Sequence, residues 1–138
     1  MLLDALERVA LSMVAITAMA LQEIAGPDLT FLGWRVLVVA GANIEPIRSG
    51  DLALALRLSR PSASKLIRRL RARGLVDLAV DPVDRRGVHV ILTTDGRRIR
   101  TAVLDRRRQI LGQALAANLP ERFGPALETL AGRLEQWS

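Results

Sequence analysis

Hydrophobic residues at the start of the chain recur with helical spacing and predict a long helix from Leu2 to Ala25. Its broad apolar face carries Leu3, Leu6, Met13, Ala20 and Ile24. No residue between Val9 and Leu21 is charged, but this run is shorter than a membrane span of ~20 residues, and Asp4 and Glu7 precede it. We therefore expect a buried or dimer-forming helix, and neither a membrane segment nor a signal peptide.

A second apolar segment follows the break at Gly26, Pro27 and Asp28. This segment, LTFLGWRVLVVAGA, offers Phe31, Trp34, Leu37 and Val38 for packing, and we expect Trp34 in the core because large aromatic side chains are usually buried. A loop is expected from Asn43 to Pro46. A short helix, DLALALRL, then begins after Ser49 as its N-cap, with Leu52, Ala53 and Leu56 facing inward.

The segment SRPSASKLIRRLRARG, Ser59 to Gly74, predicts an amphipathic helix with both ends marked. Ser59 is the expected N-cap, Pro61 is tolerated in the first turn, and Gly74 suits the left-handed position after the last turn. The apolar stripe is formed by Ala63, Leu66, Ile67 and Leu70, and the other faces carry Ser62, Ser64, Lys65, Arg68, Arg69, Arg71 and Arg73. Such a helix, ~20 Å long, suits a reader of the DNA major groove, although the same pattern also fits a solvated surface helix.

The two short helices, joined by a tight turn, form a helix-turn-helix by pattern. After Gly74 the hydrophobic period changes to alternation over residues 76–80 and again over 88–92, on either side of the turn DPVDRRG. This predicts a hairpin whose tip carries Asp84, Arg85 and Arg86. A helix-turn-helix followed by a hairpin with a basic tip is a winged helix, and the tip can lie along the DNA backbone or enter the minor groove.

Two helices are predicted at the end of the chain. The first runs from Thr94 to about Asn118, with Ile99, Val103, Ile110 and Ala114 as its buried positions. Pro120 can open the second, in which Phe123, Leu127, Leu130, Leu134 and Trp137 follow an alternating spacing of four and three residues. This is the seam of a helix that packs against a partner helix, either in a second copy or within the same chain.

Charge is unevenly distributed along the 138 residues. From Arg57 to Arg108 there are fifteen Lys or Arg against five Asp or Glu, a balance of +10, whereas the rest of the chain carries five against nine, a balance of −4. Concentrated basic charge of this kind is typical of a face that binds nucleic acid. Mean hydropathy is positive, which indicates that some apolar surface is shared with a partner.

Several kinds of chemistry are excluded or disfavoured by composition. The chain has no cysteine, which excludes disulfides, thiol catalysis and cysteine-ligated metal, and its one histidine, His89, has no second His or Cys beside which to bind a metal. We expect a structural or solvent-facing role for His89. An enzyme would have to use Asp81 and Asp84 as general acid and base, but both lie in a turn that has a structural explanation.

The order of these elements resembles the MarR family of bacterial winged-helix transcriptional regulators. The resemblance covers Leu29 to Gly96 and is most specific in DPVDRRGVHVILTTDG, residues 81–96, which is similar to the wing signature of the family. The stretch DLALALRLSRPSASKLIRRLRARGLV is similar to its helix-turn-helix, and Trp34 to Leu37 resembles its second helix. Asp77, Leu78 and Ala79 depart from the pattern, because members often have basic residues there.

The resemblance implies a mainly α fold with a small β-hairpin wing, in one domain of residues 1–138. Residues 29–93 would form the winged helix-turn-helix lobe that binds DNA, and residues 1–28 and 94–138 the helical region that holds a homodimer together. It assigns recognition to Ser62, Ser64, Lys65 and Arg68 or Arg69, makes Arg86 the wing arginine and gives it Asp84 as the partner that shapes the loop. Ser59, Arg60 and Arg85 complete the expected DNA-binding set, with Arg97 or Arg98 as further phosphate contacts.

The expected function is therefore sequence-specific transcriptional regulation by a cytoplasmic homodimer. It would act as a repressor on a pseudo-palindromic operator in double-stranded DNA, without cofactor or metal, and a small aromatic effector would release it. The effector-binding residues are not identifiable from the sequence. A basic architectural protein that binds DNA without sequence preference, or a winged helix used to bind another protein, are the alternatives.

Overall fold

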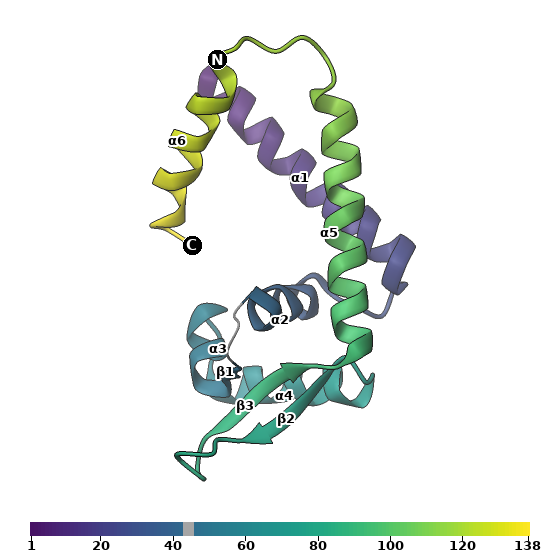
Figure 1. Ribbon diagram of the computed structural model, residues 1–138, viewed down its shortest axis with the longest axis vertical. Helices are drawn as coiled ribbons and strands as arrows, with labels where there is room; N and C mark the ends of the chain where they lie inside the picture. Colours follow the sequence, from purple (N-terminus) through teal and green to yellow (C-terminus); the bar gives the residue numbers. More distant parts are fainter. Residues whose placement is uncertain (43–45) are drawn as a thin grey trace. The chain divides into compact units, whose positions relative to one another are not determined.

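The computed structural model describes residues 1–42 and 46–138 (Figure 1). In chain order the elements are α1 (Leu2–Ala25), α2 (Phe31–Ala42), β1 (Ile47–Arg48), α3 (Ser49–Ala55), α4 (Arg60–Ala72), β2 (Val76–Val80), β3 (Val88–Leu92), α5 (Thr94–Leu115) and α6 (Phe123–Glu135). The chain divides into two units, residues 1–107 and 108–138. No helix formed by the described residues is both long and apolar enough to cross a membrane.

The first unit is built around a core to which α1 to α5 and the sheet all contribute. Its largest fully buried side chains are Val36, Leu37, Leu52, Val76, Val90 and Val103. Trp34 is buried as predicted, and so are Leu52 and Ala53 of α3, Leu56 directly after it, and Ala63, Ile67 and Leu70 of α4. Each large aliphatic side chain buried in this way stabilises the fold by about 1.5–3 kcal/mol, which holds α3 and α4 in a fixed relation.

The predicted hairpin forms between β2 and β3, which pair antiparallel with Val76 opposite Leu92 and Val80 opposite Val88. A third strand, β1, pairs antiparallel with the other edge of β3, which gives the order β1-β3-β2. This strand was not predicted, because two residues are too few to show an alternating pattern. It ties the start of α3 to the wing.

Several predicted boundaries are wrong by a few residues. Ser49 does not cap α3, because it lies inside the helix and Arg48, in an extended conformation, precedes it. The helix also ends at Ala55 instead of Leu58, and Arg57 then adopts a left-handed φ of 55°. Of the predicted loop from Asn43 to Pro46, only Pro46 lies within the described residues.

The C-terminal predictions also need correction. Helix α5 ends at Leu115 instead of Asn118. Pro120 does not open the last helix; its carbonyl accepts a hydrogen bond from the Phe123 N–H, which forms a turn, and α6 begins at Phe123. The predicted burial of Ala114 is wrong, because Ala114 is exposed and Ile110 is only partly buried.

No residue of the second unit, 108–138, is buried. Of the predicted seam residues, Phe123, Leu127 and Leu134 of α6 are exposed, as is Trp137 beyond its end, and Leu130 is partly buried. In the first unit, α1 likewise exposes Leu3, Val9, Leu11 and Val14. Apolar helix faces of this extent are typical of surfaces that pack against another chain.

Candidate nucleic-acid interface

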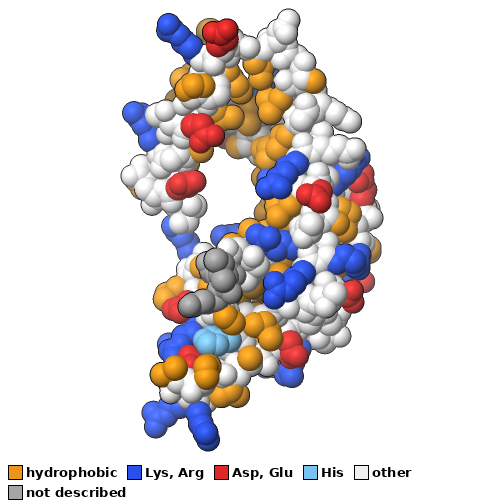
Figure 2. Space-filling view, in the orientation of Figure 1, with side chains coloured by type: hydrophobic (Ala, Val, Ile, Leu, Met, Phe, Trp, Pro, Cys, Tyr) orange, Lys and Arg blue, Asp and Glu red, His pale blue; other side chains and the backbone are white. Residues whose placement is uncertain are grey.

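A groove of about 470 Å³ separates the start of α4 from the wing. Arg60 and Ser64 line it from α4, and Arg86 lines it from the turn between β2 and β3. Figure 2 shows Lys and Arg side chains at the outer end of this hairpin, at the bottom of the view. The fold thus brings together two parts of the chain that the sequence analysis assigned separately to DNA binding.

The other predicted contacts on α4 are exposed and extend along the helix. Ser64 and Arg68 follow Arg60 at intervals of four residues and therefore share its stripe, whereas Lys65 and Arg69 lie on a neighbouring stripe. The buried residues Ala63, Ile67 and Leu70 fix the opposite face against the core. Helix α4 is held on one side and presents a continuous basic and hydroxyl surface on the other.

Ser59 has a structural role in addition to any contact with DNA. Its Oγ accepts a hydrogen bond from the Ser62 N–H at 3.3 Å, which makes it the N-cap of α4, as predicted. The Ser59 hydroxyl also donates to Ser62 Oγ at 2.9 Å. At the other end of the helix, Gly74 has a φ of 71°, the left-handed conformation that was expected there.

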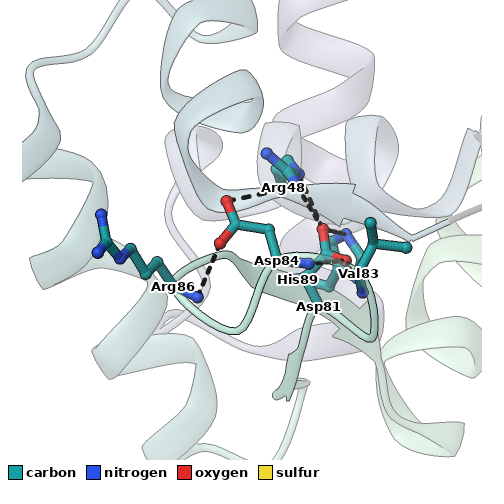
Figure 3. Close-up of polar contacts among 6 residues, drawn as sticks. All are labelled: Arg48, Asp81, Val83, Asp84, Arg86 and His89. Atoms are coloured by element: carbon teal, nitrogen blue, oxygen red, sulfur yellow. Dashed lines mark hydrogen bonds and ion pairs between the residues drawn. The ribbon is translucent and has the colours of Figure 1, made fainter.

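The turn of the wing is built around two aspartates. Asp81 Oδ1 accepts hydrogen bonds from the Val83 N–H at 2.8 Å and the Asp84 N–H at 3.2 Å. Asp84 Oδ1 in turn accepts from the backbone N–H of Arg86 at 3.1 Å. Asp84 therefore contacts Arg86 through the main chain, and Figure 3 shows the Arg86 side chain extending away from the cluster. This arrangement fixes the backbone of the turn while its arginine stays exposed.

The second oxygen of Asp81 lies between two basic side chains of neighbouring strands (Figure 3). Arg48 of β1 pairs directly with His89 of β3, so both side chains emerge on the same side of the sheet. Arg48 donates to Asp81 Oδ2 from Nη2 at 2.6 Å and from Nε at 3.0 Å, and His89 Nε2 lies 3.3 Å from the same oxygen. His89 is mostly buried, so it has the structural role that was one of its two expected roles.

These contacts shift two pKa values. Hydrogen bonds from the Val83 and Asp84 N–H groups, and then from Arg48, lower the pKa of Asp81 to about 2. The hydrogen bond to Asp81 raises the pKa of Arg48 above its usual value. Asp81 is therefore ionised at neutral pH and fully engaged in the turn, an arrangement that fits a structural role and not that of the general acid in the enzyme alternative.

The end of α4 and the start of α5 are joined at Thr93. Its hydroxyl donates to the carbonyl of Gly74 and accepts from the Gly96 N–H, and its own N–H donates to the Leu75 carbonyl at 3.2 Å. Gly96 packs so closely on this corner that a Cβ placed there would lie 2.0 Å from Leu75 O. The end of helix α4 is thus closely attached to the start of α5.

Comparison with known proteins identifies the family to which this arrangement of helices and wing belongs. The model of the MarR family matches residues 28–87, which include the helix-turn-helix and most of the wing. The HTH-type transcriptional repressor NicR of Pseudomonas putida is 34% identical over 94 residues, 68% of this chain, and the match spans 59% of that repressor's length. The chain belongs to the MarR family.

Solved structures share the fold. The crystal structure of RV1404 from Mycobacterium tuberculosis has a TM-score of 0.83, with 27% sequence identity over 98% of this chain and 90% of the other. A mutant of MepR from S. aureus, covered over 99% of its length by the whole of this chain, has a TM-score of 0.71 at 22% identity. The likeness to RV1404 extends beyond the residues matched by the MarR model into both terminal regions.

Two features of this MarR chain escaped the sequence analysis or depart from the family pattern. Arg48 was missed because neither helical nor strand spacing marks it. The sequence does contain a signal for its partner, since an Asp-Pro turn indicates a carboxylate that accepts main-chain hydrogen bonds. Asp77, at the base of the wing, lies with Oδ1 3.2 Å from Arg71 Nε. An acidic residue thus pairs with the end of α4 where the resemblance led us to expect a basic one.

Proposed function

We propose that the protein is a transcriptional regulator that binds double-stranded DNA sequence-specifically as a homodimer. The observation that carries the proposal is the juxtaposition of Arg60 and Ser64 on α4 with Arg86 of the wing around one groove. Phosphates are bound mainly by arginine and lysine, whereas base edges are read by side chains on a helix in the major groove. The MepR mutant of the same fold is bound to an oligodeoxyribonucleotide, and NicR is a transcriptional repressor.

Roles are divided between the helix and the wing. Lys65 with Ser62, Ser64 and Arg68 or Arg69 reads base edges, and Ser59 and Arg60 flank them at the start of α4. Arg85 and Arg86 of the wing, with Arg97 or Arg98, contact phosphates and supply the salt-sensitive part of the affinity. Asp84 shapes the wing. The regulator acts in the cytoplasm as a repressor.

Residues 1–28 and 94–138 form the dimerisation region, and residues 29–93 form the DNA-binding lobe. The exposed apolar faces of α1 and α6 support this division, because they need cover that a second copy supplies. Two-fold symmetry then presents two recognition helices to a pseudo-palindromic site with half-sites about one helical turn apart. Sedimentation that finds a monomer at micromolar concentration would contradict the dimer.

A small aromatic effector releases the DNA by favouring a dimer whose recognition helices are wrongly spaced. CouR from Rhodococcus jostii, 26% identical with a TM-score of 0.69, is bound to p-coumaroyl-CoA. In this chain an apolar hollow of about 330 Å³, lined in part by Ala18, Leu21 and Phe31, lies where α1 meets α2. If DNA affinity stays constant across a panel of small aromatic acids, release by such an effector is refuted. Ala18→Trp tests the hollow itself, because the larger side chain fills it.

Selection from a random duplex library at near-physiological salt tests the function directly. An enriched inverted repeat with half-sites ~10 bp apart is the expected result, because a symmetric dimer reads both strands alike. Strong binding without enrichment would favour an architectural protein, and absence of binding a winged helix that contacts another protein. Either result would refute the sequence-specific regulator.

A further inference from the structure

The turn of the wing is anchored from outside the hairpin by Arg48, which lies 33 positions before Asp81 in the sequence. Arg48 belongs to β1, immediately before α3, so it connects the helix-turn-helix to the wing. Its Nη2 lies 2.6 Å from Asp81 Oδ2 and 3.9 Å from Asp84 Oδ2. One guanidinium therefore contacts both of the carboxylates that hold the turn together.

Loss of the contact is costly because Asp81 is shielded from water. Only 7% of its side chain is exposed, whereas 45% of that of Arg48 is. A carboxylate removed from water needs a charged partner as well as hydrogen bonds, and loss of that partner leaves a buried charge unpaired. Main-chain N–H groups satisfy Oδ1 of Asp81, so Oδ2 depends on Arg48 and His89.

A chain of contacts leads from Arg48 to the wing arginine. Arg48 holds Asp81, Asp81 holds the N–H groups of Val83 and Asp84, and Asp84 holds the N–H of Arg86. The main chain closes the same turn, with the Asp81 N–H donating to the Gly87 carbonyl at 2.9 Å and the Gly87 N–H to the Asp84 carbonyl at 2.8 Å. Each link lies between the anchor and Arg86, so a change at Arg48 reaches Arg86 through the turn.

We propose that Arg48 is a positioning residue for DNA binding, which sets the orientation of the wing and hence the place of Arg86 at the groove. This inference rests on the proposed function but names a residue to which the sequence analysis gave no role. The guanidinium of Arg48 is engaged by two carboxylates, through which it acts on the wing. Arg48 also lines the groove and 45% of its side chain is exposed, so a direct phosphate contact is the alternative role that the experiment separates from positioning. The two roles can be distinguished by measurement. Substitutions at independent contacts have additive effects on the free energy of binding, whereas substitutions at a positioning residue and at its target do not.

A double-mutant cycle separates the two roles. Arg48→Gln is expected to weaken DNA binding about tenfold, and Arg86→Ala is expected to cost much less in the Arg48→Gln background than in the wild type. Arg48→Lys should recover part of the affinity because it keeps the charge without the two-donor geometry. Arg106→Gln is the control for the hydrogen-exchange measurement, because it removes the same charge and an Arg–carboxylate contact outside the DNA-binding lobe, Arg106 Nε to Glu23 Oε2 at 2.9 Å, between α1 and α5.

Hydrogen exchange in the free protein makes the test independent of DNA. In Arg48→Gln the amides of Val83 and Asp84 should exchange at least several-fold faster than in the wild type, and in Arg106→Gln at an unchanged rate. Unchanged exchange at these amides would overturn the proposal, and so would a cycle in which the two substitutions add. A protein that shows the exchange effect but binds no DNA would refute the proposed function while leaving the anchor intact.

Discussion

Gly96→Ala should destabilise the first unit, although alanine is usually the better helix residue. The added Cβ would lie 2.0 Å from Leu75 O, whereas ordinary contact begins at 3.4 Å, so α5 and the α4–β2 corner must separate by ~1.4 Å. That movement strains the hydrogen bond from the Thr93 N–H to Leu75 O, which is 3.2 Å long. Overpacking of about 1–3 kcal/mol and a weakened hydrogen bond of about 1 kcal/mol outweigh a gain in helix propensity of up to about 1 kcal/mol.

The net expectation is a loss of about 2 kcal/mol in the free energy of unfolding, measured by urea denaturation at fixed protein concentration. Gly112→Ala is the control in the same helix, because nothing lies within 4 Å of a Cβ at that position. There the substitution should stabilise by about 0.5–1 kcal/mol. Equal or higher stability of Gly96→Ala relative to the wild type would refute the close contact between α5 and Leu75.

Three further predictions concern DNA binding, pH and assembly. Lys65→Ala should cost about 1–3 kcal/mol of binding free energy mainly at one base position, whereas Arg86→Ala should weaken binding to most sequences alike; equal binding of wild type and Arg86→Ala across a salt titration would remove the wing from the interface. Because the pKa of Asp81 is lowered from 3.8 to about 2 in the folded protein, its stabilising effect is complete above pH ~4 and is lost as the pH falls toward 2. The stability difference between wild type and Asp81→Asn should therefore shrink over that range, and a difference that stays constant would contradict the assignment. Leu127→Glu, at an exposed apolar position of α6, should shift sedimentation toward the monomer, whereas an unchanged sedimentation coefficient would exclude this face from the dimer contact.

The helices of the first unit and the hairpin were predictable because each buries one face of its own sequence. Residues 60–72 show this most clearly, since the spacing of Ala63, Ile67 and Leu70 and the cap at Ser59 identified α4 nearly to the residue. Boundaries without such a signal were less predictable. Ser49 has the chemistry of an N-cap, but pairing of Arg48 with His89 places the start of α3 one residue earlier.

The candidate site was predictable only where it consists of exposed groups on regular elements. The basic face of α4 and the arginines of the wing follow from periodicity and turn chemistry. The role of Arg48 does not, because it depends on a strand of two residues that forms only against β3. Contacts between residues far apart in sequence, such as Arg48 with Asp81, are set by tertiary packing and leave no local pattern.

Because α6 has no buried residue, its helix–coil equilibrium depends on assembly of the protein. A helix of 13 residues with no buried position is only marginally stable in water by itself. Its nucleation costs free energy, and a short helix has few further hydrogen bonds to offset that cost. In the proposed dimer, the contact between copies supplies the missing free energy, so folding of this segment and association become one reaction. Dilution should then unfold α6 by dissociating the dimer. The helical circular dichroism of the protein should fall as its concentration drops below the dissociation constant of the dimer.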